Sequence, residues 1–142
     1  PASRKTPPAD KKSFTAARRG TETILVVDDE EVVAKVCKEM LESLGYHVYL
    51  AGSGQEALAV YMEKCRKIDL IILDMILPGI SGSDTYDRLR EINPEVKVLL
   101  SSGYSVEGQA TKILERGCQG FIQKPVRMNS LAQKVREILE PS

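Results

Sequence analysis

The chain lacks several patterns that mark common protein classes. No apolar run in its 142 residues approaches the roughly 20 residues of a membrane-spanning helix. It has three cysteines, an odd number without a Cys-x-x-Cys pair, and a single histidine, His47. These absences argue against a disulfide framework and against a zinc site. We expect reduced, buried thiols and a structural or surface role for His47.

A nucleotide-binding loop is also missing. The glycines at positions 52 and 54 have neither the spacing nor the following lysine of a phosphate-binding loop. We therefore expect that the chain cannot make a phosphate donor from ATP by itself.

The charges cancel over the whole chain but are unevenly distributed along it. Residues 1–20 hold six Lys/Arg and one Asp, about +5, and the rest holds 14 Lys/Arg and 19 Asp/Glu, about −5. Residues 1–21 also hold three prolines and a single large apolar residue, which predicts a disordered basic linker or tail. Residues 22–142 are long enough for one folded domain. A nucleic-acid-binding arm is the alternative for the tail, and no other feature supports it.

From Thr23 onward, a strand pattern is followed by a helix pattern five times. The predicted strands are 24–27, 46–51, 69–74, 96–101 and 120–123, and the predicted helices are 32–44, 53–66, 81–93, 107–116 and a last one through 139. Five such units with short connections predict an α/β fold, a doubly wound, flavodoxin-like three-layer sandwich. The parallel sheet order 2-1-3-4-5 would bring the first and third strands together.

Local signals predict where the helices begin and end. Ser53 and Glu56 form a capping-box pattern, Gly45 is a C-terminal cap for the first helix, and Asn129 caps the last. The first helix carries an apolar face that we expect to be buried, made of Val32, Val33, Val36, Cys37, Met40, Leu41 and Leu44.

Polar residues stand where the predicted strands stop: Asp28, Asp29, Asp74, Ser102 and Lys124. The carboxyl ends of parallel strands share one edge of a sheet, and ligands bind in the crevice outside that edge. Three clustered carboxylates would repel one another, and a hard cation removes that repulsion. Mg²⁺ fits such oxygen ligands, with Mn²⁺ as an alternative.

The same set suits transfer of a phosphoryl group. An aspartate can accept the group as an acyl phosphate, Lys124 offers a fixed positive charge, and Ser102 can donate a hydrogen bond to a phosphate oxygen. Each signal is weak alone, since an Asp-Asp pair after a strand is often only a helix N-terminus. All of them at successive strand ends, in this order, are a much stronger signal.

Four segments resemble the receiver domains of two-component signalling: 24–30 (ILVVDDE), 73–78 (LDMILP) with Gly82, 100–104 (LSSGY) and 120–125 (GFIQKP). The resemblance covers about residues 22–140. It implies that Asp74 is the phosphoacceptor, and that Asp28, Asp29 and the backbone carbonyl of Ile76 bind Mg²⁺ together with it.

The resemblance implies further roles around this site. Ser102 would be the hydroxyl switch, Lys124 would bind the phosphate, and the bond between Lys124 and Pro125 would be cis. Phe121 matches an aromatic switch position where many relatives carry tyrosine. Positions 76 and 104 tune phosphate loss in the family, and neither Ile76 nor Tyr104 can orient an attacking water well. We therefore expect a long-lived phosphoaspartate.

The resemblance implies a histidine kinase domain or a histidine phosphotransfer protein as phosphodonor. We expect the receiver of a hybrid histidine kinase in the cytoplasm, and a stand-alone single-domain regulator is the alternative. Dimerisation through the fourth helix, fifth strand and fifth helix is a family expectation. We expect no contact of the domain with nucleic acid or membrane.

Other classes fit the residues less well. A phosphatase of the haloacid dehalogenase type would show Asp-x-Asp at the first strand, and a flavin carrier would show a polar, non-acidic first loop. A degenerate receiver that only binds a partner would lack one of the site residues.

Overall fold

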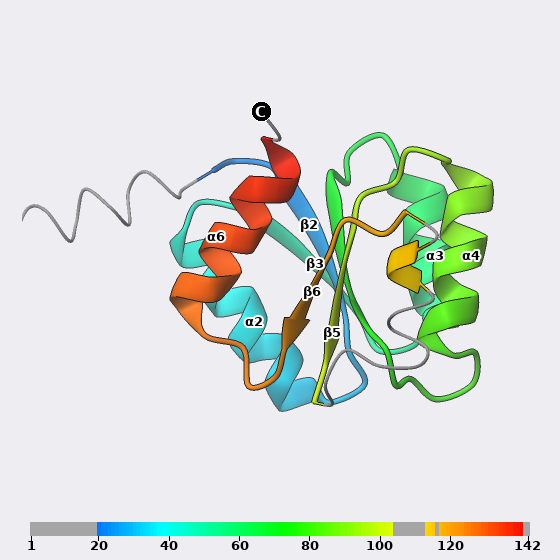
Figure 1. The fold of residues 1–142 in the computed structure, drawn as a ribbon, viewed down its shortest axis with the longest axis horizontal. Helices are drawn as coiled ribbons and strands as arrows, with labels where there is room; N and C mark the ends of the chain where they lie inside the picture. The colour runs from blue at the N-terminus through cyan, green and yellow to red at the C-terminus, as the bar shows by residue number, and fades with distance from the viewer. Residues whose placement is uncertain (1–19, 104–112, 116, 141–142) are drawn as a thin grey trace, which may run out of the picture.

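The computed structural model describes residues 20–103, 113–115 and 117–140, and in this part of the chain strands alternate with helices (Figure 1). The elements in chain order are β2 (Thr23–Val27), α2 (Glu31–Ser43), β3 (His47–Ala51), α3 (Gly54–Lys64), β4 (Leu70–Asp74), α4 (Gly82–Ile92), β5 (Val98–Ser102), β6 (Gly120–Gln123) and α6 (Met128–Leu139). Residues 113–115 are also helical. Most of the predicted tail and of the predicted helix 107–116 lies outside the described residues.

The five strands form one parallel sheet in the order β3-β2-β4-β5-β6. This is the predicted order 2-1-3-4-5, so the doubly wound fold is confirmed. Helices α2 and α6 cover one face of the sheet, and α3 and α4 cover the other (Figure 1). None of the helices in the described ranges is both long and apolar enough to cross a membrane.

The two faces of the sheet explain why the strands read as unbroken apolar runs. Side chains of a strand point alternately to opposite faces. Leu25 and Val27 therefore belong to the core under α3 and α4, while Ile24 and Val26 belong to the core under α2 and α6. In β4 every residue is buried, including Asp74 at its end. A strand buried on both faces needs no polar side chains until it leaves the sheet.

Two local expectations about α2 and α6 are wrong. Val32 and Val36 were expected on the buried face of α2, but their side chains are exposed, at 74% and 45%. The buried stripe of α2 runs through Ala34, Cys37 and Leu41 instead. Because the apolar positions of α2 cover more than one face, periodicity placed the two valines with the core.

The last helix begins before the expected cap. It starts at Met128 with Arg127 in the N-cap position, and no side chain caps it there. Asn129 therefore lies inside the first turn. The capping box of α3 is confirmed only in part: Ser53 Oγ accepts from Glu56 N at 3.1 Å, but the Glu56 carboxylate accepts the N–H of Gly52 instead of that of Ser53.

Two of the three thiols and the histidine lie as expected. Cys37 and Cys118 are buried and Cys65 is half-buried, while His47 is exposed at the start of β3. Burial raises the pKa of Cys37 to about 12, so this thiol stays protonated and unreactive near neutral pH.

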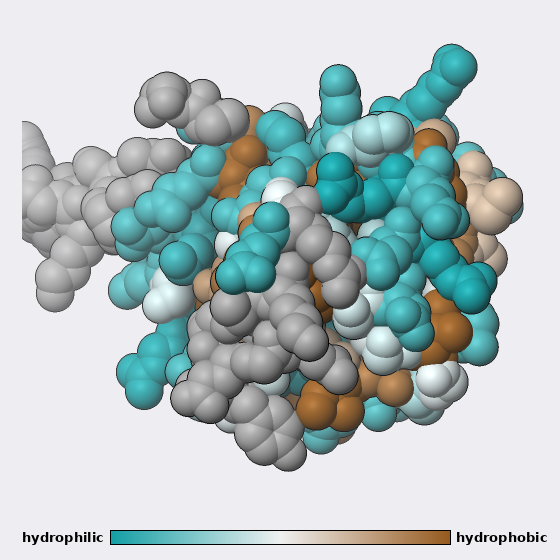
Figure 2. Space-filling view, turned by 45° about the vertical axis from the view of Figure 1, so that its right-hand side comes forward, coloured by the Kyte–Doolittle hydropathy of each residue, from teal (hydrophilic) through white to brown (hydrophobic). Residues whose placement is uncertain are grey.

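On the side of the molecule toward α4, the visible surface is mostly hydrophilic, with small hydrophobic patches between the polar side chains (Figure 2).

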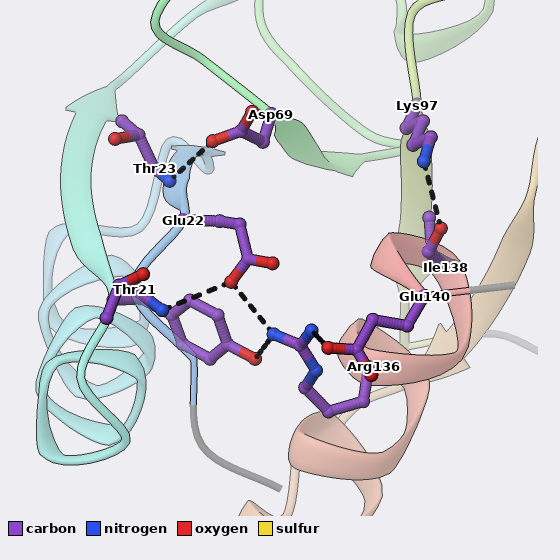
Figure 3. Close-up of polar contacts among 9 residues, drawn as sticks. Thr21, Glu22, Thr23, Asp69, Lys97, Arg136, Ile138 and Glu140 are labelled. Atoms are coloured by element: carbon purple, nitrogen blue, oxygen red, sulfur yellow. Dashed lines mark hydrogen bonds and ion pairs between the residues drawn. The ribbon is translucent and has the colours of Figure 1, made fainter.

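A buried arginine joins the chain segment before β2 to the end of α6 (Figure 3). Arg136 donates to Glu22 Oε1 at 2.8 Å and to the hydroxyl of Tyr46 at 3.1 Å, and it also pairs with Glu140. Burial alone would lower the pKa of Arg136, but these partners hold that pKa above its ordinary value. The cluster lies at the opposite end of the sheet from Asp74.

We predict that Arg136→Met lowers the free energy of unfolding by about 1–3 kcal/mol, because the buried Tyr46 hydroxyl and Glu22 lose their charged donor. Urea denaturation followed by circular dichroism measures this. Arg127→Met is the control, since Arg127 is exposed. Equal stabilities of the two variants would contradict the assigned role of Arg136.

Candidate functional site

Three acidic residues meet at the carboxyl ends of β2 and β4. The two strands are neighbours and pair Val27 with Leu73, so the residues that follow, Asp28 and Asp74, lie side by side. Each of Asp28, Asp29 and Asp74 offers a carboxylate oxygen, and these oxygens lie within 4.8 Å of one another. Asp28 and Asp74 are buried and Asp29 is exposed. The predicted acidic cluster is present in the structure.

Lys124 follows β6 and reaches across the strand ends to this cluster. Its Nζ lies 2.7 Å from Asp28 Oδ2 and 3.1 Å from Asp74 Oδ2. Burial alone would lower the pKa of Lys124, but the hydrogen bonds and the attraction of the two carboxylates hold that pKa above its ordinary value. The ammonium therefore stays charged and partly neutralises the acidic cluster.

Asp74 is nearly enclosed, with an exposed fraction of 4% for the whole residue. Burial raises the pKa of Asp74 above its ordinary value, and the N–H of Ile76, 3.2 Å from Asp74 Oδ1, and the charge of Lys124 offset only part of that rise. A further positive charge at the site would favour the ionised, nucleophilic carboxylate.

The donor set fits a hard divalent cation. It offers carboxylate oxygens only, with no histidine or thiol among them, which suits Mg²⁺ better than zinc. Three carboxylates leave coordination positions for water or for phosphate oxygens. The Ile76 carbonyl is a further predicted ligand of the cation.

Ser102 and Lys124 are tied together through their backbones. Ser102 ends β5 as a buried residue, and its carbonyl accepts the N–H of Lys124 at 2.7 Å. The peptide bond between Lys124 and Pro125 is cis, as expected. Phe121 is half-buried in β6 and packs against the core under α3 and α4. Tyr104 lies outside the described residues.

Two features near the site were missed at the level of sequence. Glu30 Oε1 lies 3.9 Å from Lys124 Nζ and adds a fourth carboxylate to the rim. An apolar groove of about 460 Å³ also runs from the site along α2, and the residues that line it include Val32, Val36, Met40, Pro125 and Val126. The surplus of apolar residues on α2, beyond one helical face, was the available signal.

Comparison with known proteins agrees with this geometry. Residues 24–136 match the family described as the response regulator receiver domain. The chain belongs to this family. A solved receiver domain from Clostridium thermocellum superposes with a TM-score of 0.80 at 30% identity, covering 83% of this chain and 94% of that one. The match covers nearly all of the described domain.

Relatives of this receiver domain occur in different protein contexts. The sensor kinase CckA of Brucella abortus is 34% identical over 85% of this chain and 13% of its own length. The phosphate regulon regulator PhoB of Pseudomonas aeruginosa is 34% identical over 82% of this chain and 51% of its own length. The chain thus spans about half or less of these relatives.

A second similar structure is a complex named as containing BeF3 and Mg²⁺. It is the CheX–CheY complex of Borrelia burgdorferi, with a TM-score of 0.78 at 26% identity over 82% of this chain and 88% of that one.

Proposed function

We propose that this receiver domain accepts a phosphoryl group on Asp74 from a phosphohistidine of a partner protein, with Mg²⁺ bound at the acidic cluster. One observation carries the proposal: a nearly enclosed carboxylate lies 3.1 Å from a charged lysine, beside two further carboxylates, at the carboxyl end of a parallel sheet. Receiver domains as a family act in two-component signalling, which fits this chemistry.

The residues would act in defined steps. An Asp74 carboxylate oxygen attacks phosphorus, a P–O bond forms, the P–N bond to the histidine breaks, and the imidazole leaves with the electron pair and takes a proton from solvent. Mg²⁺, when bound, balances the charge of the carboxylates and of the incoming group. Lys124 is close enough to bind a phosphate oxygen next to Asp74. The acyl phosphate remains on the chain.

The response to phosphate would begin at Ser102 and Phe121. A phosphoryl group adds oxygen acceptors beside the end of β5, and the Ser102 hydroxyl is the donor expected to turn toward them. Phe121 has no hydroxyl, so its part in the switch would depend on ring packing against the core alone. If one conformation of the domain interacts better with the phosphoryl group, phosphorylation shifts the population toward that conformation.

We predict that acetyl phosphate with Mg²⁺ adds one phosphate per chain and that Asp74→Asn abolishes this labelling. Intact-protein mass spectrometry at neutral pH measures the gain in mass. Asp69→Asn is the control, since Asp69 is an exposed aspartate before β4. Continued turnover of a free phosphoester without a stable adduct would favour a phosphatase, and labelling of Asp74→Asn would overturn the assignment.

The phosphoaspartate is expected to be long-lived. The Ile76 side chain lines the site and is 58% exposed, so an apolar group stands where a polar one could orient an attacking water. We predict that Ile76→Asn speeds loss of the phosphate about tenfold, because an amide can hold that water. Decay of the labelled protein measures the rate, with Ile76→Val as control. An unchanged decay rate in Ile76→Asn would remove the basis for this expectation.

The apolar groove beside the site suits the helix that carries the donor histidine. It is continuous with the site, because Asp28 and Lys124 line one end of it while Val32 and Val36 extend it along α2. A donor helix must approach from a side from which its histidine reaches Asp74. Exposed apolar residues that border a reactive site are typical of a docking surface.

We predict that Val32→Glu slows phosphotransfer from a phosphorylated histidine kinase or phosphotransfer protein at least tenfold, because docking would bury an unpaired charge. Labelling by acetyl phosphate should stay unchanged. Met62→Glu is the matched control, an equally exposed apolar residue on α3, at 69% exposure. Equal transfer rates for Val32→Glu and Met62→Glu would contradict the docking site. So would a loss of acetyl phosphate labelling in Val32→Glu as large as its loss of phosphotransfer.

We propose a hybrid histidine kinase as the context of this domain, with a stand-alone regulator as the alternative. The similarity to a sensor kinase supports the first and the equal similarity to PhoB supports the second. The sequence that adjoins residue 1 in the full-length protein tests the choice, since a hybrid kinase would place a kinase domain there. The proposed dimer face includes residues outside the described ranges.

A further inference from the structure

The proposed metal ligands lie at two places: Asp28 and Asp29 begin the loop after β2, and Asp74 ends β4, with Ile76 in the loop that follows it. The distance between these two places decides whether Asp28 and Asp74 can share one cation. The first turn of α3 contacts the loop after β4 directly, and it is linked to the loop after β2 through the end of β3. We propose that Gly54, in this turn, is a positioning residue for the site, and that its missing side chain fixes the spacing of the two loops. This inference rests on the proposed function.

One side of this connection runs from Asp28 to α3. The N–H of Asp28 donates to the carbonyl of Ala51 at 3.0 Å, so the loop after β2 is bound to the end of β3. Ser53 Oγ accepts from Glu56 N, and the Glu56 carboxylate accepts from Gly52 N at 2.9 Å. These reciprocal bonds hold the start of α3 against the segment that carries Ala51.

The other side runs from Gly54 to the loop after β4. A methyl group at Gly54 would overlap Thr85 Oγ1 and would lie 2.5 Å from Ile80 Cγ1 and 2.9 Å from Ile80 Cδ1. The backbone of Gly54 is not in the left-handed region, so space and not conformation requires glycine here. Thr85 is fully buried and cannot swing into solvent.

The contact continues from Thr85 to Asp74. Thr85 Oγ1 donates to the carbonyl of Ser81 at 2.7 Å, which ties it to the residue before Gly82. A methyl group at Gly82 would lie 2.7 Å from the Asp74 carbonyl oxygen and 2.8 Å from Met75 Cα, and Gly82 N donates to Met75 O. The start of α4 therefore rests directly on the backbone of Asp74.

A side chain at Gly54 would push against Ile80 and Thr85, which lie just before and just after the start of α4. The strain would be relieved by moving Ile80 and Thr85, and with them the loop after β4 that carries Ile76 and adjoins Asp74. Mg²⁺ tolerates little departure from octahedral geometry. Substituting a residue that contacts and orients metal ligands typically lowers metal affinity tenfold or more.

The test is Gly54→Ala, compared with the wild type for Mg²⁺ affinity by isothermal titration calorimetry and for the rate of labelling by acetyl phosphate. We expect Mg²⁺ binding at least tenfold weaker and a labelling rate reduced in step with it at low Mg²⁺. Alanine favours a helix more than glycine does, so helix propensity alone predicts no loss.

Two glycine variants separate positioning from neighbouring effects. Gly52→Ala lies two residues away, and its methyl group would meet only Glu56 Oε1 at an ordinary 3.5 Å. Gly45→Ala lies at the far end of the sheet, has a φ of +102°, and would overlap the Gly20 carbonyl oxygen. We expect Gly52→Ala to behave as the wild type and Gly45→Ala to lower the melting temperature without changing Mg²⁺ affinity.

A second substitution provides a rescue and guards against misfolding. Ile80→Ala removes two of the three atoms closest to the added methyl group. We expect Gly54→Ala with Ile80→Ala to bind Mg²⁺ more tightly than Gly54→Ala alone. If Gly54→Ala does not fold, the double variant is compared with Ile80→Ala alone, and weaker Mg²⁺ binding is again expected.

The outcomes distinguish this inference from the proposed function. If the wild type binds Mg²⁺ and is labelled, but Gly54→Ala matches Gly52→Ala in Mg²⁺ affinity, the positioning role is wrong and the proposed function stands. If weaker Mg²⁺ binding appears equally in Gly45→Ala, the effect is general instability and the positioning role is also wrong. If the wild type itself is not labelled, the proposed function fails.

Discussion

The ammonium of Lys124 between the carboxylates of Asp28 and Asp74 is the interaction on which the rest of the site depends. Buried carboxylates side by side repel one another, and each has lost most of its contact with water. One charged donor within 3.1 Å of both makes their burial tolerable. The three residues come from the ends of three different strands, so the pairing requires the strand order observed here.

The strand order and the close packing of the helices hold these charged residues in fixed positions. Strands buried on both faces leave only their ends for polar residues, which concentrates charge at one edge of the sheet. The first turns of α3 and α4 pack closely at that edge, because Gly54 and Gly82 have no side chain there. This close packing positions the loops at the edge. A small sheet edge thereby brings charged residues from distant parts of the chain together.

The fold and the acidic cluster could be predicted because both depend on short-range patterns. Apolar runs mark the strands, and the residue after each run marks the crevice, as at Asp74 and Lys124. The surplus of apolar residues on α2 indicates that some of them lie outside the core, but the pattern does not say which, so the exposure of Val32 in particular could not be predicted. The Arg136 cluster joins residues 114 positions apart, and no local pattern encodes such a pairing.

The same Lys124 contact also limits how the site can respond to phosphate. The backbone N–H of Lys124 donates to the Ser102 carbonyl, and its side chain donates to Asp74. A shift of the ammonium toward a phosphoryl group would therefore pull on the end of β6. Phe121 lies three residues earlier on that strand and packs on the core. A tyrosine there could gain a hydrogen bond on changing rotamer, whereas phenylalanine gains only contact area. The energy gap of the proposed switch would therefore come from packing, which is sensitive to small changes in the core around Phe121.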